Sequence, residues 1–130
     1  MKLLIDTHAF LWAVENPQRL SADSRRQIEN PANTVFVSIA SAWELAIKAA
    51  LTRSAHFPRN VASWFADALE GASFDLLPIE LRHVLEVEYL PAHHRDPFDR
   101  LLIAQARIEN LTIVTEDRAF DAYRVPLLHT

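Results

Sequence analysis

Short, continuously apolar runs alternate along this chain with longer segments whose apolar residues recur every three or four positions. A short continuous apolar run is typical of a strand in a parallel sheet, because such a strand is buried on both faces. On this basis we expect strands over residues 3–5, 34–37, 74–77, 112–115 and 125–128. The last of these is predicted at an edge of the sheet, since Pro126 cannot donate a hydrogen bond to a neighbouring strand.

The segments with helical spacing fill the gaps between these strands and carry start and stop signals. We expect helices over residues 9–14, 21–29, 39–51, 60–70, 80–88 and 97–109. The last begins with Asp96 as its N-cap and Pro97 at the first helical position, and Asn110 lies just beyond its end. Ser21 is predicted to cap the second helix, and Gly71 to stop the fourth. Strand-helix alternation of this kind predicts a three-layer α/β fold, with a mostly parallel central sheet of about five strands and helices on both faces.

Composition narrows the class of protein. The chain has 130 residues, half of them hydrophobic, which suits one domain over residues 1–130. No charge-free apolar stretch approaches the roughly 18 residues of a membrane span. The apolar start is broken by Asp6 and His8, so we interpret it as a core strand and not as a signal peptide. There is no cysteine, which excludes disulfides and thiolate metal sites and is compatible with a cytoplasmic location. Gly71 is the one glycine, so a glycine-rich phosphate loop is excluded.

Four acidic residues are predicted to meet at the carboxyl edge of the sheet, where open parallel sheets bind ligands. Asp6 ends the first strand, and Asp117 lies two residues past the fourth. Glu44 is in the second turn of the helix that leaves the second strand, and Asp99 is in the first turn of the helix that precedes the fourth. Helical spacing places Glu44 on a face with Ala40, Ile47 and Leu51, and Asp99 on a face with Leu102, Ile103 and Ala106. Both acids therefore point inward, where an unpaired carboxylate is costly.

Each acid also has a local explanation. Asp6 and Asp117 would cap the turns that follow their strands. Glu44 would form an ion pair with Lys48 one turn on, and Asp99 would interact with the helix dipole. Taken together, however, four carboxylates at one edge repel one another unless a cation holds them. Oxygen ligands of this kind suit Mg²⁺ or Mn²⁺, which could activate a water for attack on a phosphodiester.

Other polar residues are assigned simpler roles. Asp96 is interpreted as a helix cap only, and Glu116 and Asp121 as solvated residues. The histidines show no HExxH spacing, so we interpret His93 and His94 as solvated loop residues and not as metal ligands.

Four segments in this order and spacing resemble the PIN domain family, and specifically the VapC-type toxins of toxin-antitoxin modules. They are LLIDTHAFLW, VSIASAWELAIK, HHRDPFDRLLIAQA and TIVTEDRAFDAY, and the resemblance covers nearly the whole chain. It implies a PIN-like fold and an endoribonuclease that depends on Mg²⁺ or Mn²⁺. By position it implies Asp6, Asp99 and Asp117 as metal ligands, and Glu44 as a further ligand or as the group that positions the attacking water. Thr7, Ser38 and Thr115 match polar positions that flank such sites and would orient ligands or waters.

The resemblance also implies partners. VapC-type proteins form homodimers, are neutralised by a VapB antitoxin that presses a basic side chain into the acidic pocket, and cut structured RNA such as tRNA or rRNA. The formal net charge of −4 opposes RNA binding, but four of the acids belong to the predicted site and eleven of the thirteen basic residues are arginines. Arg95, Arg100 and Arg118 lie beside Asp99 and Asp117 and are candidates for phosphate contacts; their alternative roles are solubility or carboxylate pairing.

Two other functions compete with a nuclease. One is a PIN-like module that binds RNA or protein without cutting it, which intact acids disfavour. The other is a phosphoacceptor receiver domain, which needs paired acids at the first strand and an aspartate at the end of the third. Here Asp6 stands alone and the third strand ends in Leu77-Pro78.

Overall fold

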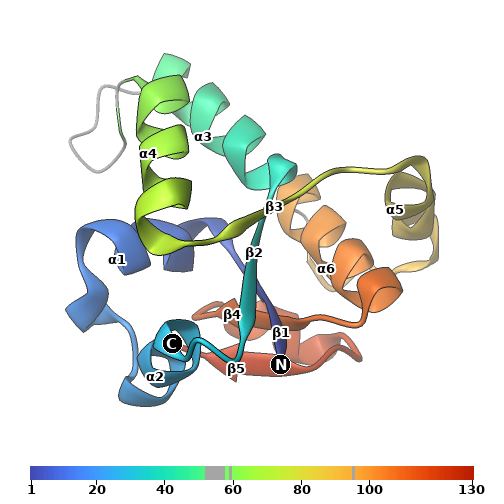
Figure 1. The fold of residues 1–130 in the computed structure, drawn as a ribbon. Helices are drawn as coiled ribbons and strands as arrows, with labels where there is room; N and C mark the ends of the chain where they lie inside the picture. The colour runs from blue at the N-terminus through green and yellow to red at the C-terminus, as the bar shows by residue number, and fades with distance from the viewer. Residues whose placement is uncertain (52–57, 59, 95) are drawn as a thin grey trace.

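The computed structural model describes residues 1–51, 58, 60–94 and 96–130, and within them the strands form one five-stranded, wholly parallel sheet (Figure 1). The strand order is β3-β2-β1-β4-β5, so β1 lies at the centre and β3 and β5 are the edges. The strands are β1 (Lys2–Ile5), β2 (Thr34–Ser38), β3 (Asp75–Leu77), β4 (Thr112–Thr115) and β5 (Leu127–His129). The predicted α/β class and the edge position of the last strand are confirmed.

Helices cover both faces of this sheet, which gives the three predicted layers (Figure 1). The helices are α1 (Thr7–Glu15), α2 (Ala22–Glu29), α3 (Ile39–Leu51), α4 (Val61–Ala72), α5 (Leu81–Glu86) and α6 (Pro97–Glu109). Short 3₁₀ helices follow at η1 (Pro17–Arg19), η2 (Val87–Tyr89) and η3 (Arg118–Ala122). Side chains of α1 and α4 pack on one face, where Phe10 and Phe65 meet edge to face at 5.4 Å between ring centroids. The opposite face is covered by α6.

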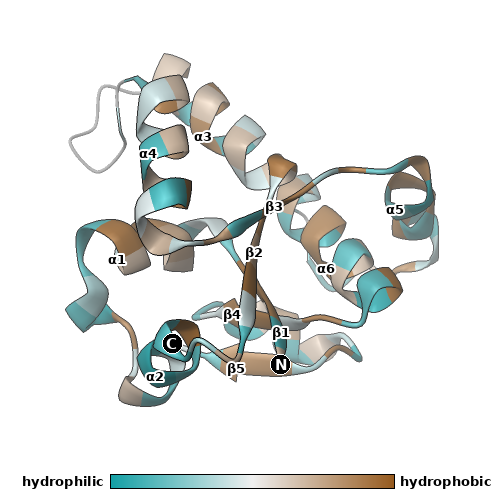
Figure 2. Cartoon of the chain, in the orientation of Figure 1, coloured by the Kyte–Doolittle hydropathy of each residue, from teal (hydrophilic) through white to brown (hydrophobic). Residues whose placement is uncertain are grey.

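Strand side chains alternate between the two cores, which explains why the central strands contain continuous apolar runs. Leu3 and Ile5 belong to the core under α1 and α4, Leu4 belongs to the core under α6, and all three are fully buried. Ile113 and Val114 of β4 divide between the two cores in the same way. In Figure 2 the central strands are accordingly mostly brown, whereas the exposed helix α2 is largely teal.

Some element ends differ from those predicted. Gly71 does not stop α4: the helix continues to Ala72, and Ser73 ends it in the left-handed conformation, with φ of 57°. Glycine favours that conformation for steric reasons but is not required for it. The predicted helix over 80–88 is divided into α5 and the 3₁₀ turn η2. The last strand begins at Leu127 because Pro126 contributes only its carbonyl, which accepts from the Ile113 amide at 2.9 Å.

Among the described residues, every helix is too short or too polar to cross a bilayer.

Candidate active site at the carboxyl edge of the sheet

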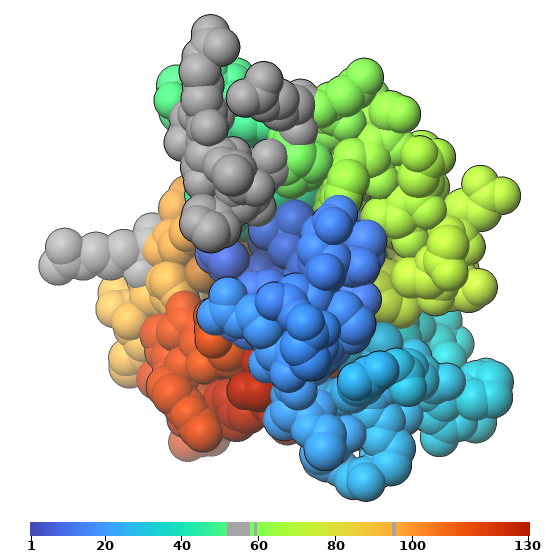
Figure 3. Space-filling view, turned by 90° about the vertical axis from the view of Figure 1, so that its left-hand side faces the viewer, coloured from blue at the N-terminus to red at the C-terminus, as the bar shows by residue number. Residues whose placement is uncertain are grey.

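All four predicted acids line one cleft of about 470 Å³ beyond the carboxyl ends of β1 and β4. The residues that line it come from four separate parts of the sequence: Asp6, Thr7, His8, Glu44, Lys48, His94, Asp96, Asp99, Glu116, Asp117 and Arg118. The space-filling view shows the blue N-terminal segment bordering the orange and red segments of the last third of the chain (Figure 3). The parallel topology therefore gathers these carboxylates as the sequence predicts.

Asp6 is held at the base of the cleft by two hydrogen bonds. Its Oδ1 accepts from the Ala9 amide at 2.8 Å, so Asp6 is also the N-cap of α1. Its Oδ2 accepts from Thr115 Oγ1 at 2.5 Å. This second bond follows from strand register, because Ile5 lies opposite Val114 and the next residues along each strand are Asp6 and Thr115. Burial raises the pKa of Asp6 to about 6, and the two hydrogen bonds oppose that rise.

Glu44 is fixed on the neighbouring wall, and only 3% of it is exposed. Its Oε1 accepts from Thr7 Oγ1 at 2.7 Å, and its Oε2 lies 2.6 Å from the ammonium of Lys48. The Thr7 hydroxyl also lies 2.9 Å from Ser41 Oγ. The ion pair with Lys48 is therefore present, but it forms inside the cleft and not on a solvated helix face.

Asp99 is the acid most perturbed by its surroundings. Burial raises its pKa to about 8, and the negative charges of Asp96, Asp6, Glu44 and Asp117 add to the rise. Asp117 is more exposed; burial raises its pKa, but hydrogen bonds from the Ala119 amide and from His94 outweigh this effect and lower the pKa overall. At neutral pH the Asp99 carboxyl, with its pKa raised to about 8, therefore favours the protonated form unless a positive charge is added to the cleft.

His94 joins Asp99 to Asp117, and the prediction that it is a solvated loop residue is wrong. Its Nε2 lies 3.0 Å from the Oδ2 atoms of both acids. Its Nδ1 accepts from the Asp96 amide at 3.1 Å, so the ring proton of the neutral form is on Nε2, facing the carboxylates. His93 instead packs its ring against Tyr123. The one signal for His94 in the sequence is that it shortly precedes Asp96 and Asp99. That position does not reveal that its ring lies between Asp99 and Asp117 in the folded chain.

Asp96 caps α6 as predicted, since its Oδ1 accepts from the amides of Phe98 and Asp99 at 2.8 and 3.2 Å. Of the remaining acids, Glu116 is exposed and lines the cleft. Asp121 is exposed, as predicted, and its Oδ1 lies 2.7 Å from Nε2 of His129.

Not all of the residues predicted to support the site contact its acids in the structure. Thr7 and Thr115 donate to Glu44 and Asp6, as described. Among the described residues, the hydrogen bonds of Ser38 go to groups other than the four acids: it donates to Gln105 Oε1 at 2.6 Å and accepts from the Ala40 amide at the start of α3. Arg118 lines the cleft and is 75% exposed. Arg95 lies outside the described residues.

Arg100 does not line the cleft, and the structure gives it another role. Its guanidinium donates to the carbonyls of Val87, Leu90 and Pro91 at 2.9 to 3.3 Å, and lies 3.4 Å from the carbonyl of His94. Arg100 therefore fastens the connection between α5 and α6, including the segment that carries His94. This arrangement leaves the guanidinium committed to the protein and not to a substrate phosphate.

The donor set of the cleft fits a divalent cation that prefers oxygen ligands, such as Mg²⁺ or Mn²⁺. Asp6, Asp99 and Asp117 present carboxylate oxygens, and an oxygen that already accepts one hydrogen bond keeps a second lone pair. The raised pKa of Asp99 is the observation that favours a cation, because a positive charge among these groups would allow Asp99 to ionise.

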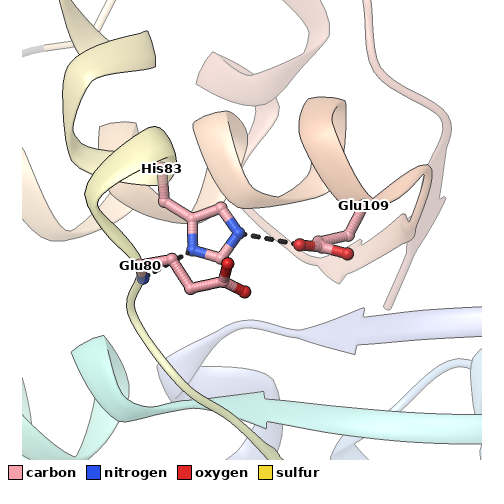
Figure 4. Close-up of side chains that lie close together, drawn as sticks. All are labelled: Glu80, His83 and Glu109. Atoms are coloured by element: carbon pink, nitrogen blue, oxygen red, sulfur yellow. Dashed lines mark hydrogen bonds and ion pairs between the residues drawn. The ribbon is translucent and has the colours of Figure 1, made fainter.

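Two groups of possible ligand residues lie close together among the described residues. One, His94, Asp99 and Asp117, is in the cleft, and the other, Glu80, His83 and Glu109, lies between α5 and α6 (Figure 4). The His83 ring is completely buried, and Nδ1 accepts from the Glu80 amide at 3.0 Å. The ring proton is therefore on Nε2, which lies 2.9 Å from Glu109 Oε1 and donates to it. The one lone pair of the neutral ring is already used, so this group is a structural network that joins α5 to α6 and not a metal site.

The fold and the cleft define a parallel α/β domain with convergent carboxylates at the strand ends. The PIN domain family profile matches residues 3–126, and the chain therefore belongs to the PIN domain family. A search of curated proteins gave no match. Membership of the PIN domain family excludes the alternative that this chain is a phosphoacceptor receiver domain.

Similar solved structures include VapBC complexes and FitAcB. VapBC2 from Rickettsia felis, bound to a promoter DNA fragment, has a TM-score of 0.75 at 15% identity over 99% of this chain and 98% of that chain. DNA-bound VapBC from Salmonella typhimurium has a TM-score of 0.72 at 18% identity over the same shares of the two chains. FitAcB from Neisseria gonorrhoeae has a TM-score of 0.65 at 20% identity over 97% of this chain and 96% of that chain. At these identities the similarity is one of fold: this chain resembles the VapC-type PIN domains.

Proposed function

We propose that this protein is a metal-dependent endoribonuclease and the toxin component of a VapBC-type module. The observation that carries the proposal is the convergence of Asp6, Glu44, Asp99 and Asp117 in one cleft of a PIN domain. A chain without cysteine has no thiol nucleophile, and the acids suit hydrolysis by water. We expect products with a 3′-hydroxyl and a 5′-phosphate.

Asp6, Asp99 and Asp117 would hold Mg²⁺ or Mn²⁺, and Glu44 would be a further ligand or would position the attacking water. The bound metal would supply Lewis-acid stabilisation of the phosphate and a more acidic water. The chain's own polar groups keep the carboxylates in place: Thr115 holds Asp6, Thr7 holds Glu44, and His94 donates toward Asp99 and Asp117. This support limits the rearrangement that metal binding would need.

The proposed partners follow from the VapC likeness. We propose a VapB-type antitoxin as the inhibitor, because the similar structures from R. felis and S. typhimurium are VapBC complexes. A basic antitoxin side chain would compensate the acidic cleft in the way a metal does. Structured RNA such as tRNA or rRNA, a homodimer and a cytoplasmic location complete the proposal.

The test is cleavage of purified tRNA and rRNA by the isolated protein, with Mg²⁺, with Mn²⁺ and with EDTA. We expect cleavage with either metal and none with EDTA. Asp99→Asn, which keeps the side-chain shape, should lower the rate at least about 100-fold, a loss typical of a group that stabilises transition-state charge. Asp67→Asn, which changes an exposed acid of α4, is the matched control and should cleave at the parent rate.

Two results would contradict the proposal. Products that end in a 2′,3′-cyclic phosphate would exclude attack by a metal-activated water. RNA binding without cleavage, in a folded protein that has bound Mn²⁺, would favour the non-cleaving PIN-like module instead.

A further inference from the structure

The side chains of the candidate active site differ in how much of each is exposed to solvent. Glu44 and Asp6 lie deepest, with 3% and 5% of each residue exposed, whereas the side chains of Asp117 and Arg118 are 43% and 75% exposed. Lys48, with 35% of its side chain exposed, lies between the buried acid that it contacts and the solvent. A ligand that enters from solvent therefore meets Arg118, Asp117 and the partly exposed Lys48 before it reaches the deepest carboxylates.

The position of Lys48 is set by helix geometry. α3 leaves the carboxyl end of β2, so each successive turn lies farther from the sheet edge. Glu44 is in the second turn and Lys48 follows one turn later, on the same face. Thr7 holds the Glu44 carboxylate at 2.7 Å and Lys48 contacts that carboxylate at 2.6 Å, so the ammonium is held beside Glu44 in the lining of the cleft.

The charges of the cleft explain why a phosphate would need this lysine. Six carboxylates line the cleft, from Asp6, Glu44, Asp96, Asp99, Glu116 and Asp117. Lys48 and Arg118 are the Lys and Arg side chains among the described residues that line it. A phosphodiester approaching these acids is repelled unless fixed cations offset the repulsion, and lysine is suited to phosphate as a compact point charge.

We propose that Lys48 contacts a backbone phosphate of the RNA substrate at the mouth of the cleft, in addition to its ion pair with Glu44. The inference rests on the proposed nuclease function and adds a substrate-contacting residue to it. The competing role is purely structural: Lys48 would only hold Glu44 in place for the metal.

Two binding measurements on Lys48→Gln separate these roles. The first is the affinity for a fluorescein-labelled single-stranded RNA, measured by fluorescence anisotropy from 50 to 300 mM NaCl. Ca²⁺ replaces Mg²⁺ to prevent cleavage, and a gel checks that the RNA stays intact. The plot of log K against log[NaCl] has a negative slope. Loss of one phosphate contact should make that slope shallower by about 0.7 and weaken binding about three- to tenfold. Lys48→Arg keeps the charge and should restore the slope.

The second measurement is the affinity for Mn²⁺ by calorimetry without RNA. Under the proposal Lys48→Gln binds Mn²⁺ as tightly as the parent or more tightly, because a cation near the carboxylates has been removed. The matched control is Lys2→Gln, since Lys2 and Lys48 are the two lysines of the chain. Lys2 is exposed at the amino end of β1, about 13 Å along the strand from Asp6, and its loss should leave both affinities unchanged.

The proposal is overturned if Lys48→Gln shows the same salt slope as Lys2→Gln. It is also overturned if Mn²⁺ and RNA affinity fall together in Lys48→Gln, since that is the result expected of a lysine that only positions Glu44. Failure of the parent protein to bind or cut RNA would instead refute the proposed function, on which the inference depends.

Discussion

Binding of a divalent metal to this protein should displace a proton from Asp99. Burial and the neighbouring acids raise the pKa of Asp99 to about 8, while burial raises that of Asp6 to about 6. At pH 7 the metal-free cleft should therefore hold about 0.9 proton on Asp99 and about 0.1 on Asp6. Asp117, whose pKa is lowered, should hold none. Because a metal-bound carboxylate is ionised, we expect about one proton to be released per site filled at pH 7.

The same protons set how metal affinity depends on pH. Removing a proton from a group with a pKa one unit above the solution pH costs about 1.4 kcal/mol, which is a tenfold loss of affinity. The slope of log K against pH equals the number of protons released, so it should be about 1.5 at pH 6, about 1 at pH 7 and close to 0 at pH 9. Affinity thus rises with pH and levels off above the pKa of Asp99.

Calorimetric titration with Mn²⁺ in buffers of different ionisation enthalpy measures the released protons directly. The observed heat, plotted against the ionisation enthalpy of the buffer, has a slope equal to that number. Asp99→Asn should bind Mn²⁺ more weakly and release close to no proton at pH 7. Asp67→Asn should match the parent in both respects, because Asp67 is exposed on α4 and lies outside the cleft.

The reasoning would be refuted if the parent bound Mn²⁺ at pH 7 with no release of protons. Asp99 would then be ionised before the metal arrives, or would not be a ligand. Release of one proton by Asp99→Asn would be equally damaging, because the proton would have to come from another group.

Two further predictions concern residues that support the site or the fold. Arg100→Met should destabilise the protein by roughly 2–3 kcal/mol in urea denaturation, because the Val87 and Leu90 carbonyls lose a charged donor. Unchanged stability, together with a shallower salt dependence of RNA binding, would instead support the original prediction that Arg100 contacts a substrate phosphate. His83→Leu should cost about 2 kcal/mol, since it removes the hydrogen bonds to Glu80 and Glu109, and it should leave Mn²⁺ affinity unchanged. Weaker Mn²⁺ binding by His83→Leu would show that this network is coupled to the cleft.

Much of the fold could be predicted because burial on both faces leaves a direct mark on the sequence. Leu3, Leu4 and Ile5 alternate between the two cores, yet all must be apolar, and this gives the short continuous run. The end of α4 could not be predicted in the same way. A left-handed residue is needed there, and Ser73 adopts it although Gly71 is the residue that favours it.

The site was predictable where chain topology alone determines position. Asp6 and Asp117 follow neighbouring parallel strands, so they must reach the same edge of the sheet. His94 and Arg100 were misjudged because their roles depend on how the chain folds between α5 and α6. Nothing in the residue pattern indicates that His94 turns back to Asp99 and Asp117, or that Arg100 donates to carbonyls of the same connection.

By itself, therefore, the sequence determined the strands, the helices and the set of acids at the carboxyl edge, because side-chain periodicity and strand direction are local properties. The tertiary structure decided which groups touch. Thr115 reaches Asp6 across 109 residues and Thr7 reaches Glu44 across 37, and both bonds depend on strand register and helix packing to within a fraction of an ångström. The pKa values of the acids also diverge only in the folded chain, where that of Asp99 is raised to about 8 and that of Asp117 is lowered. Burial, hydrogen bonds and neighbouring charges cause this difference.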